Sequence, residues 1–169
     1  MNAKEFANLL VKNELATLEE LQGCSQKEIE QLEKHIGAKL PQNYKEFLAL
    51  MGHDAGIFRN GTDYLYKDLF NLTEDTKEIL MDGPFKLPDD AFVFSSHQGY
   101  IFAYFRFSDG DDPPIYIYKE MEPSPIKKAS SFFEYLTKSL DEEISNWNQL
   151  ESRERYMREA RAKKYGKIK

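Results

Sequence analysis

An acidic stretch in the second half of the chain, Asp109-Gly110-Asp111-Asp112, has the residue types that open a calcium-binding loop, and Glu120 stands twelve positions into it. Such a loop holds its ion with oxygen ligands at alternating positions and turns sharply at a glycine. Here Pro113 and Pro114 take the positions of an oxygen ligand and of the flexible glycine. The stretch therefore predicts a turn of solvated carboxylates and no metal site.

Histidine and cysteine offer little further chemistry. The chain contains His35, His53, His97 and a single cysteine, Cys24. None of them has the H-E-x-x-H or C-x-x-C spacing that brings metal ligands or a redox pair together. One cysteine cannot form an intrachain disulfide, which fits a reducing compartment, and no neighbour in the sequence would lower its pKa. We predict a bystander cysteine, non-catalytic histidines, and neither metal nor cofactor.

Pairs of adjacent acids, such as Asp89-Asp90 and Asp111-Asp112, could in principle divide the roles of acid and base. That division requires an apolar pocket that separates their pKa values, and polar turns do not supply one. The chain also lacks the nucleophile motif G-x-S-x-G, the phosphate loop G-x-x-x-x-G-K and the dinucleotide motif G-x-G-x-x-G. We therefore predict a binding protein and not an enzyme.

The elements that position these residues begin with helices. Apolar spacing predicts them at residues 6–13, 26–37, 41–52, 73–81 and 133–147. The form Ser25-Gln26-Lys27-Glu28 is typical of a capping box, and Gly37 marks the end of the helix that follows. Pro41 begins the next helix, because a first-turn residue needs no amide hydrogen, and Gly52 ends it.

Strands follow the first three helices. Asn60-Gly61 predicts a hairpin between residues 57–59 and 63–66, since both turn residues tolerate a positive φ. Alternating apolar residues predict three further strands, at 91–95, 100–107 and 115–119. His97-Gln98-Gly99 predicts the turn between the first two of these three strands.

The alternation gives the later strands two different faces. Ile115 and Ile117 alternate with Tyr116 and Tyr118, and the middle strand has aromatic residues on both of its sides. We predict helices on the aliphatic side and a partly open tyrosine side that binds a protein partner; the alternative is that the tail or a loop covers this side. The predicted contact residues are the anchors Tyr100, Phe102, Tyr104, Tyr116 and Tyr118 and the steering charges Asp109, Asp111 and Asp112.

Charge is distributed unevenly along the 169 residues. Residues 146–169 contain eight basic and three acidic side chains, a net charge of +5, and the whole chain has a net charge of −6, so the first 145 residues have a net charge of −11. An acidic body disfavours nucleic acid and membrane surfaces and favours basic partners. The N-terminus, with Glu5 early and no long apolar run, does not resemble a signal peptide. No window approaches the length of a membrane span, and we expect a cytoplasmic protein.

Several of these blocks together resemble the SUKH superfamily, which contains the fungal Smi/Knr regulators of cell-wall synthesis and many bacterial immunity proteins. The resemblance covers residues 25–140 and rests on order and spacing rather than on one motif. Its carriers are Glu28-Ile29, Leu32-Glu33 and Gly37, then Leu40-Pro41-Gln42-Asn43-Tyr44, Phe47-Leu48 and Gly52, then Gly99 with the strand to Phe107, Pro113-Pro114-Ile115-Tyr116, and Ser130-Ser131-Phe132-Phe133-Glu134-Tyr135-Leu136.

The resemblance implies an α+β fold, with N-terminal helices packed on a central, twisted antiparallel sheet and a long C-terminal helix. We expect residues 1–145 to form a single SUKH-like (Smi/Knr-like) domain and residues 146–169 to form a basic, solvated helical extension. The resemblance also implies a non-catalytic bacterial immunity protein or antitoxin that binds a cognate polymorphic toxin, many of which are nucleases. The alternative is a regulatory scaffold of the cell-wall type. The sequence does not predict an oligomeric state.

Overall fold

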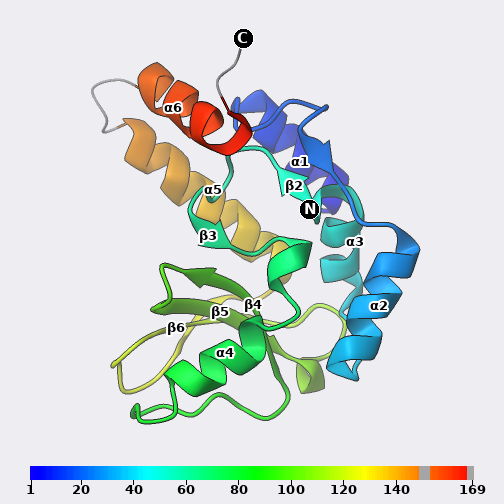
Figure 1. The fold of residues 1–169 in the computed structure, drawn as a ribbon, viewed down its shortest axis with the longest axis vertical. Helices are drawn as coiled ribbons and strands as arrows, with labels where there is room; N and C mark the ends of the chain where they lie inside the picture. The colour runs from blue at the N-terminus through cyan, green and yellow to red at the C-terminus, as the bar shows by residue number, and fades with distance from the viewer. Residues whose placement is uncertain (149–152, 167–169) are drawn as a thin grey trace.

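Three helices open the chain, and the cap residues identified in the sequence delimit α2. The computed structural model describes residues 1–148 and 153–166, and its first helices are Ala3–Lys12 (α1), Gln26–Ile36 (α2) and Gln42–Met51 (α3) (Figure 1). Ser25 and Glu28 form the predicted capping box. Gly37 ends α2 at a φ of 70°, a left-handed conformation that glycine adopts without steric penalty.

The centre of the molecule is an antiparallel sheet with the strand order β3-β4-β5-β6-β7. Its strands are Thr62–Asp63 (β3), Ala91–His97 (β4), Ile101–Arg106 (β5), Ile115–Lys119 (β6) and Ile126–Ala129 (β7). A two-stranded ribbon pairs Leu21–Gln22 (β1) with Asp54–Ala55 (β2). The remaining elements are short turns of 3-10 helix at Tyr66–Asp68 (η1) and Phe107–Asp109 (η2) and the helices Leu72–Ile79 (α4), Phe132–Asn148 (α5) and Arg153–Tyr165 (α6).

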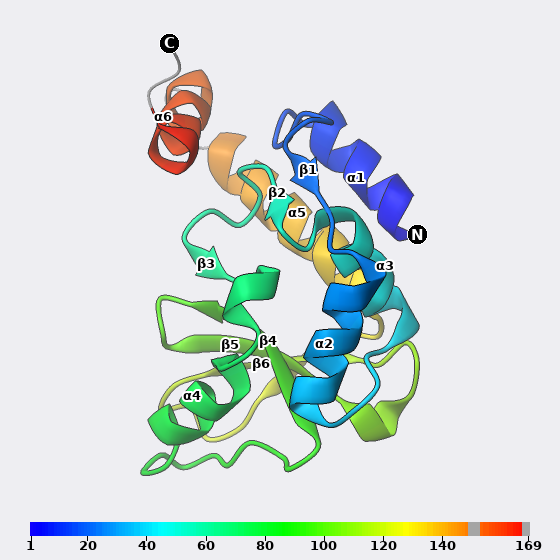
Figure 2. The same ribbon diagram turned by 45° about the vertical axis from the view of Figure 1, so that its right-hand side comes forward.

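These elements form layers, with α1, α2, α3 and α5 on one side of the sheet and α4 on the other (Figures 1 and 2). The fold is therefore α+β, and the predicted architecture with its long helix after the sheet is confirmed. As predicted, helices pack on the side of the sheet that contains Ile115 and Ile117, and aromatic residues fill much of the core between them. The ring of Tyr44 lies within 6.2 Å, centroid to centroid, of Phe47, Phe92, Phe94, Phe105 and Phe132. An edge-to-face pair contributes about 0.5–1.5 kcal/mol beyond its buried area.

The predicted hairpin around Asn60-Gly61 is wrong. Gly61 does lie in a turn, at a φ of 81°, but the segment that follows it pairs with β4. Ile57 and Phe58 are buried in the helix-side core, and the amide of Ile57 donates to the carbonyl oxygen of Leu15 at 2.7 Å. Burial of these two side chains outweighs the local preference of the turn for a hairpin.

The C-terminal extension also differs from its expected solvated state. In α6, Met157 and Ala160 are buried against the domain. Three charged residues of the extension, Glu151, Lys167 and Lys169, lie outside the described residues. Within 1–148 and 153–166, no helix combines the length and apolar character that crossing a bilayer requires.

Close backbone packing generates a first testable prediction. A Cβ atom added to Gly23 would lie 1.8 Å from the carbonyl oxygen of Ala49 in α3, whereas one added to Gly83 would meet nothing nearer than 3.5 Å. We expect Gly23→Ala to lower the free energy of unfolding by about 1–3 kcal/mol, because the backbone must move. Urea denaturation of both variants measures the effect. An equal loss of stability in the control Gly83→Ala would contradict the close packing of Gly23 against α3 as the cause.

Candidate partner-binding surfaces

The predicted tyrosine face is covered in the structure. Phe102, Tyr104 and Tyr118 are each at most 2% exposed, and they form a second hydrophobic core with residues of α4 and of the segment after it. The prediction of an open face is wrong for these three side chains, because the covering layer consists of α4 and residues 80–90. The apolar members that this layer contributes are Leu72, Leu80, Phe85 and Leu87. A partner can reach the three aromatic rings only if the layer moves.

Aromatic contacts hold this cover in place. The ring centroids of Phe85 and Tyr118 are 4.5 Å apart, and the Tyr118 hydroxyl donates to the carbonyl oxygen of Glu122 at 2.9 Å. Tyr104 stacks on Tyr116 at 5.4 Å, and burial raises the pKa of Tyr104 to about 12. The apolar residues after the predicted helix, Leu80, Phe85 and Leu87, form part of this cover, but their spacing alone does not indicate where they pack.

The other predicted contact residues do not form one site. Tyr100 is 37% exposed at the start of β5, whereas Asp109 and Asp111 are exposed at the opposite end of that strand. The Asp112 carboxylate accepts a hydrogen bond from the amide of Phe132 at 3.3 Å, which satisfies a free donor at the start of α5. That these residues contact a partner stays a prediction, and the structure separates the aromatic residues from the acidic ones.

The candidate chemical residues have partners inside the chain. His35 Nε2 lies 2.7 Å from the carbonyl oxygen of Phe70, and His53 Nε2 lies 2.9 Å from Glu28 Oε1. Cys24 is buried, and this burial raises its pKa to about 12, far from the range of a reactive thiolate. Among the described residues, no three potential metal ligands form a group that could hold an ion.

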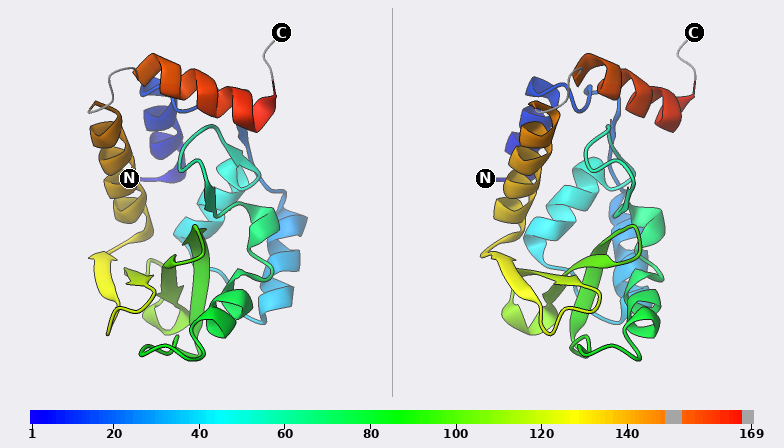
Figure 3. Two further views of the ribbon diagram at one scale, coloured as in Figure 1. Left: turned by 60° about the vertical axis from the view of Figure 1, so that its left-hand side comes forward. Right: turned by 90° about the vertical axis from the view of Figure 1, so that its left-hand side faces the viewer.

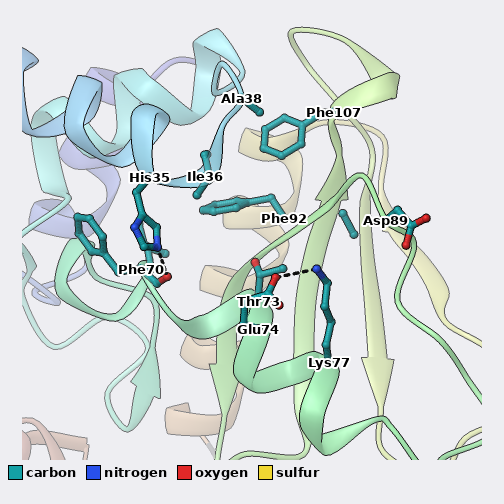
Figure 4. A pocket seen from close by; sticks show the side chains of 12 residues that line it. His35, Ile36, Ala38, Phe70, Thr73, Glu74, Lys77, Asp89, Phe92 and Phe107 are labelled. Carbon is teal, nitrogen blue, oxygen red and sulfur yellow. Dashed lines mark hydrogen bonds and ion pairs between the residues drawn. The ribbon is translucent and has the colours of Figure 1, made fainter.

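One cleft lies between the C-terminal end of α2 and the N-terminal half of α4 (Figure 4). It has a volume of about 310 Å³ and an aromatic floor of Phe92 and Phe107. Most of its polar side chains already have partners, because Lys77 pairs with Glu74 at 2.7 Å, the Thr73 hydroxyl accepts from the amide of Val93, and His35 contacts the carbonyl oxygen of Phe70. A ligand would have to compete with these contacts, which makes the cleft a weak candidate for a binding site.

A wider groove of about 420 Å³ lies between α5 and one end of the sheet. Ile101 and Ile117, both half-buried, come from the central strands. One side of α5 contributes Tyr135, Ser139, Glu142, Glu143 and Asn146, whose spacing of four, three, one and three residues places them on the same helix face. The groove therefore combines apolar side chains from the sheet with a polar wall.

Arg59 connects the two sides of this groove. Its guanidinium donates to the hydroxyls of Tyr135 and, at 2.8 Å, of Ser95, and it lies 5.3 Å from the centroid of the Tyr135 ring. Its backbone amide donates to Glu143 Oε2 at 3.1 Å. These contacts stabilise Arg59 at a φ of 53°, an unusual value for a residue with a side chain. Burial raises the pKa of Glu143 to about 7, and the nearby Arg59 only partly offsets this effect.

Three apolar side chains are exposed in and beside the two turns at the same end of the sheet as the groove, and we call them together the apolar patch. Its members are Tyr100, Met121 and Ile126, with exposures of 37%, 74% and 61%. Ile126 pairs across the strands with Ile117, and the carbonyl oxygen of Tyr100 accepts from the amide of Glu120, which brings the β5 and β6 ends together. Sequence reasoning missed Met121 and Ile126, because β7 has only one strong strand former and was not predicted. Exposed apolar patches are typical of interaction sites.

Comparison with known families adds one finding. A model described as the SMI1 / KNR4 family (SUKH-1) matches residues 23–138. The matched span includes α2, α3, α4, the whole central sheet and the first turns of α5, and it excludes α1 and α6. No curated protein matches the chain.

The burial of the tyrosine face gives a testable difference between two neighbouring aromatic residues. We expect Phe102→Ala to lower the free energy of unfolding by about 3–5 kcal/mol, because it empties a buried site. Tyr100→Ala should change it by no more than about 0.5 kcal/mol, because the ring is partly exposed. Chemical denaturation of both variants measures the two changes in the free energy of unfolding. Similar small losses would mean that the layer over Phe102 does not seal it.

The raised pKa of Glu143 predicts a pH dependence of stability. The carboxyl has a pKa of about 7 in the folded chain and an ordinary value near 4.5 in the unfolded chain, so the folded state binds more protons between these values. Stability therefore falls as the pH rises from about 4.5 to about 7. We expect Glu143→Gln to reduce that slope in unfolding experiments at pH 5, 6, 7 and 8. The exposed neighbour Glu142→Gln is the control, and an unchanged slope in Glu143→Gln would refute the assignment.

Proposed function

The chain belongs to the SMI1 / KNR4 family (SUKH-1), and on that premise we propose that it is an immunity protein, which neutralises a cognate polymorphic toxin by binding to it. The family match over residues 23–138 is the observation that carries this proposal. The protein occludes the toxin and transforms no substrate of its own. It acts in the cytoplasm, where the single thiol of Cys24 stays reduced.

Charge indicates the chemistry of the toxin. The first 145 residues have a net charge of −11, and complementary charge accelerates encounter and disfavours wrong partners. A toxin domain with a basic surface fits this body, and nucleases have such surfaces because they bind phosphate backbones. Asp109 and Asp111, which are exposed beyond the end of β5, contribute to this attraction without a fixed contact.

The groove and the apolar patch beside it supply the contact surface. Tyr100, Met121 and Ile126 provide apolar area that solvent reaches in the free chain. Ile101 and Ile117 continue this area into the groove, where a protruding side chain of the toxin can be desolvated. Binding energy in protein complexes concentrates in such apolar anchors surrounded by polar groups. Of the predicted aromatic anchors, Tyr100 keeps its role, and the buried Phe102, Tyr104 and Tyr118 act by supporting the sheet.

The direct test of the proposed function is whether this chain rescues cells from the toxin. The toxin domain encoded in the same gene neighbourhood is expressed with and without this chain, and growth and complex formation are measured. We expect growth to be restored and the two proteins to copurify in a fixed ratio. Unrelieved killing without a complex would refute the proposal.

A paired substitution tests the contact surface. We expect Met121→Ser combined with Ile126→Ser to weaken toxin binding at least tenfold, about 1.4 kcal/mol, because two exposed anchors are lost while the net charge is unchanged. The stability should change little, because both side chains are largely exposed. Met81→Ser, at another exposed methionine, is the control. Titration calorimetry with the toxin domain measures both, and equal affinities would exclude the patch.

A further inference from the structure

The basic helix α6 lies across the end of the domain formed by α1 and the loop around β2 (Figure 3). It reaches loops that are more than a hundred residues distant in sequence. Arg161 donates to Glu20 Oε1 at 3.2 Å and to the carbonyl oxygen of Glu14 at 2.9 Å. Lys164 pairs with Asp54 at 2.6 Å. The helix is thus seated on three acidic residues, Glu14, Glu20 and Asp54, which we call the acidic platform.

Polar contacts dominate the interface between α6 and the acidic platform. The hydroxyl of Tyr165 lies 3.0 Å from both carboxylate oxygens of Asp54, and Arg153 donates to the carbonyl oxygen of Asn13 at 3.0 Å. Met157 and Ala160 of α6 are buried, and the ring of Tyr156 packs on Trp147 at a centroid distance of 5.6 Å. Charged contacts of this kind weaken with salt, whose screening length is about 8 Å at physiological ionic strength. A competing basic helix must therefore replace the ion pairs of α6 and also cover the apolar area on which Met157, Ala160 and Tyr156 pack.

Two residues of the platform, Glu20 and Asp54, also have partners that do not belong to α6. Glu20 Oε2 accepts from the amide of Thr17 at 2.9 Å, and Asp54 Oδ1 accepts from the amide of Gly56 at 2.9 Å. The pairing of β1 with β2 holds the two loops side by side. The carboxylates of Glu20 and Asp54 therefore retain these contacts when α6 leaves, which favours a preformed binding site.

The fit between α6 and the platform is incomplete. An open hollow of about 730 Å³ remains between α6 and the loop after α1, lined by Val11, Ala16, Leu18, Glu19 and Met157 among others. Leu18 is 72% exposed beside it. A helix with larger apolar side chains between its basic residues would bury this area as well and would hold the platform more tightly than α6 does.

We propose that the acidic platform is a docking site for a basic helix, which α6 occupies within the chain and which a basic helix of the toxin takes in its place. Glu20 and Asp54 bind the arginine and lysine side chains of that helix, spaced three apart as in Arg161 and Lys164. The hollow accommodates its apolar residues. This proposal rests on the proposed function for the identity of the partner, but the existence of the docking site does not depend on it.

The first arm of the test uses a labelled peptide with the sequence of residues 153–166 and the full-length chain. Arg161→Gln with Lys164→Gln vacates the platform, and we expect the peptide to bind this variant at least tenfold more tightly than the wild-type chain, by fluorescence anisotropy at low salt. Adding Glu20→Gln and Asp54→Asn should abolish the gain. A peptide with glutamine in place of its own arginine and lysine at these two positions is the matched control and should not bind. Equal binding to wild type and variant, or no binding to either, would overturn the docking site.

The second arm uses the toxin domain. We expect the Arg161→Gln, Lys164→Gln chain to bind it at least tenfold more tightly than wild type, and Glu20→Gln with Asp54→Asn to lose that gain. Toxin binding that is unaffected by all four substitutions would refute the platform as the toxin's site while leaving the immunity function intact. Peptide binding without any toxin binding by the wild-type or variant chain would refute the immunity function and leave the docking site intact.

Discussion

The structure depends on one constraint, which is that the central strands bury both of their faces. On one side, the rings around Tyr44 pack the sheet against α3 and α5. On the other side, α4 and residues 80–90 cover Phe102, Tyr104 and Tyr118. A sheet enclosed in this way offers a partner only its end and the loops around it. The surfaces that the proposals assign to a partner are the groove beside α5, the apolar patch around Ile126 and, when α6 leaves it, the acidic platform.

These surfaces have different physical characters. The patch and groove offer apolar area, with Arg59 and Glu143 in a desolvated polar wall. The platform offers fixed carboxylates and already holds a basic helix. Charge attracts a partner over distance and apolar anchors then slow its departure, so an acidic body with both kinds of surface suits rapid and lasting capture of a basic protein. The core aromatic residues support the scaffold that presents these surfaces.

Local signals in the sequence predicted much of the fold. The capping box at Ser25, the glycine at position 37 and the alternation in β4, β5 and β6 each depend on interactions between near neighbours, and all of them are confirmed. The failures involve distant contacts. The predicted hairpin at Asn60-Gly61 does not form, because Ile57 and Phe58 are buried in the core instead. The tyrosine face, which was predicted to be open, is covered by α4 and the segment after it. Neither outcome can be derived from periodicity, because it depends on which segment packs over which.

The central claim is that the end of the sheet, and not its tyrosine face, binds a toxin. Hydrogen exchange of the chain, measured by mass spectrometry with and without the toxin domain, tests it most directly. We expect slower exchange in the complex for residues 98–101 and 117–128, unchanged exchange in α4, and faster exchange in α6 as it leaves the platform. Protection confined to α4 and residues 80–90, or no protection anywhere in the presence of saturating toxin, would contradict it.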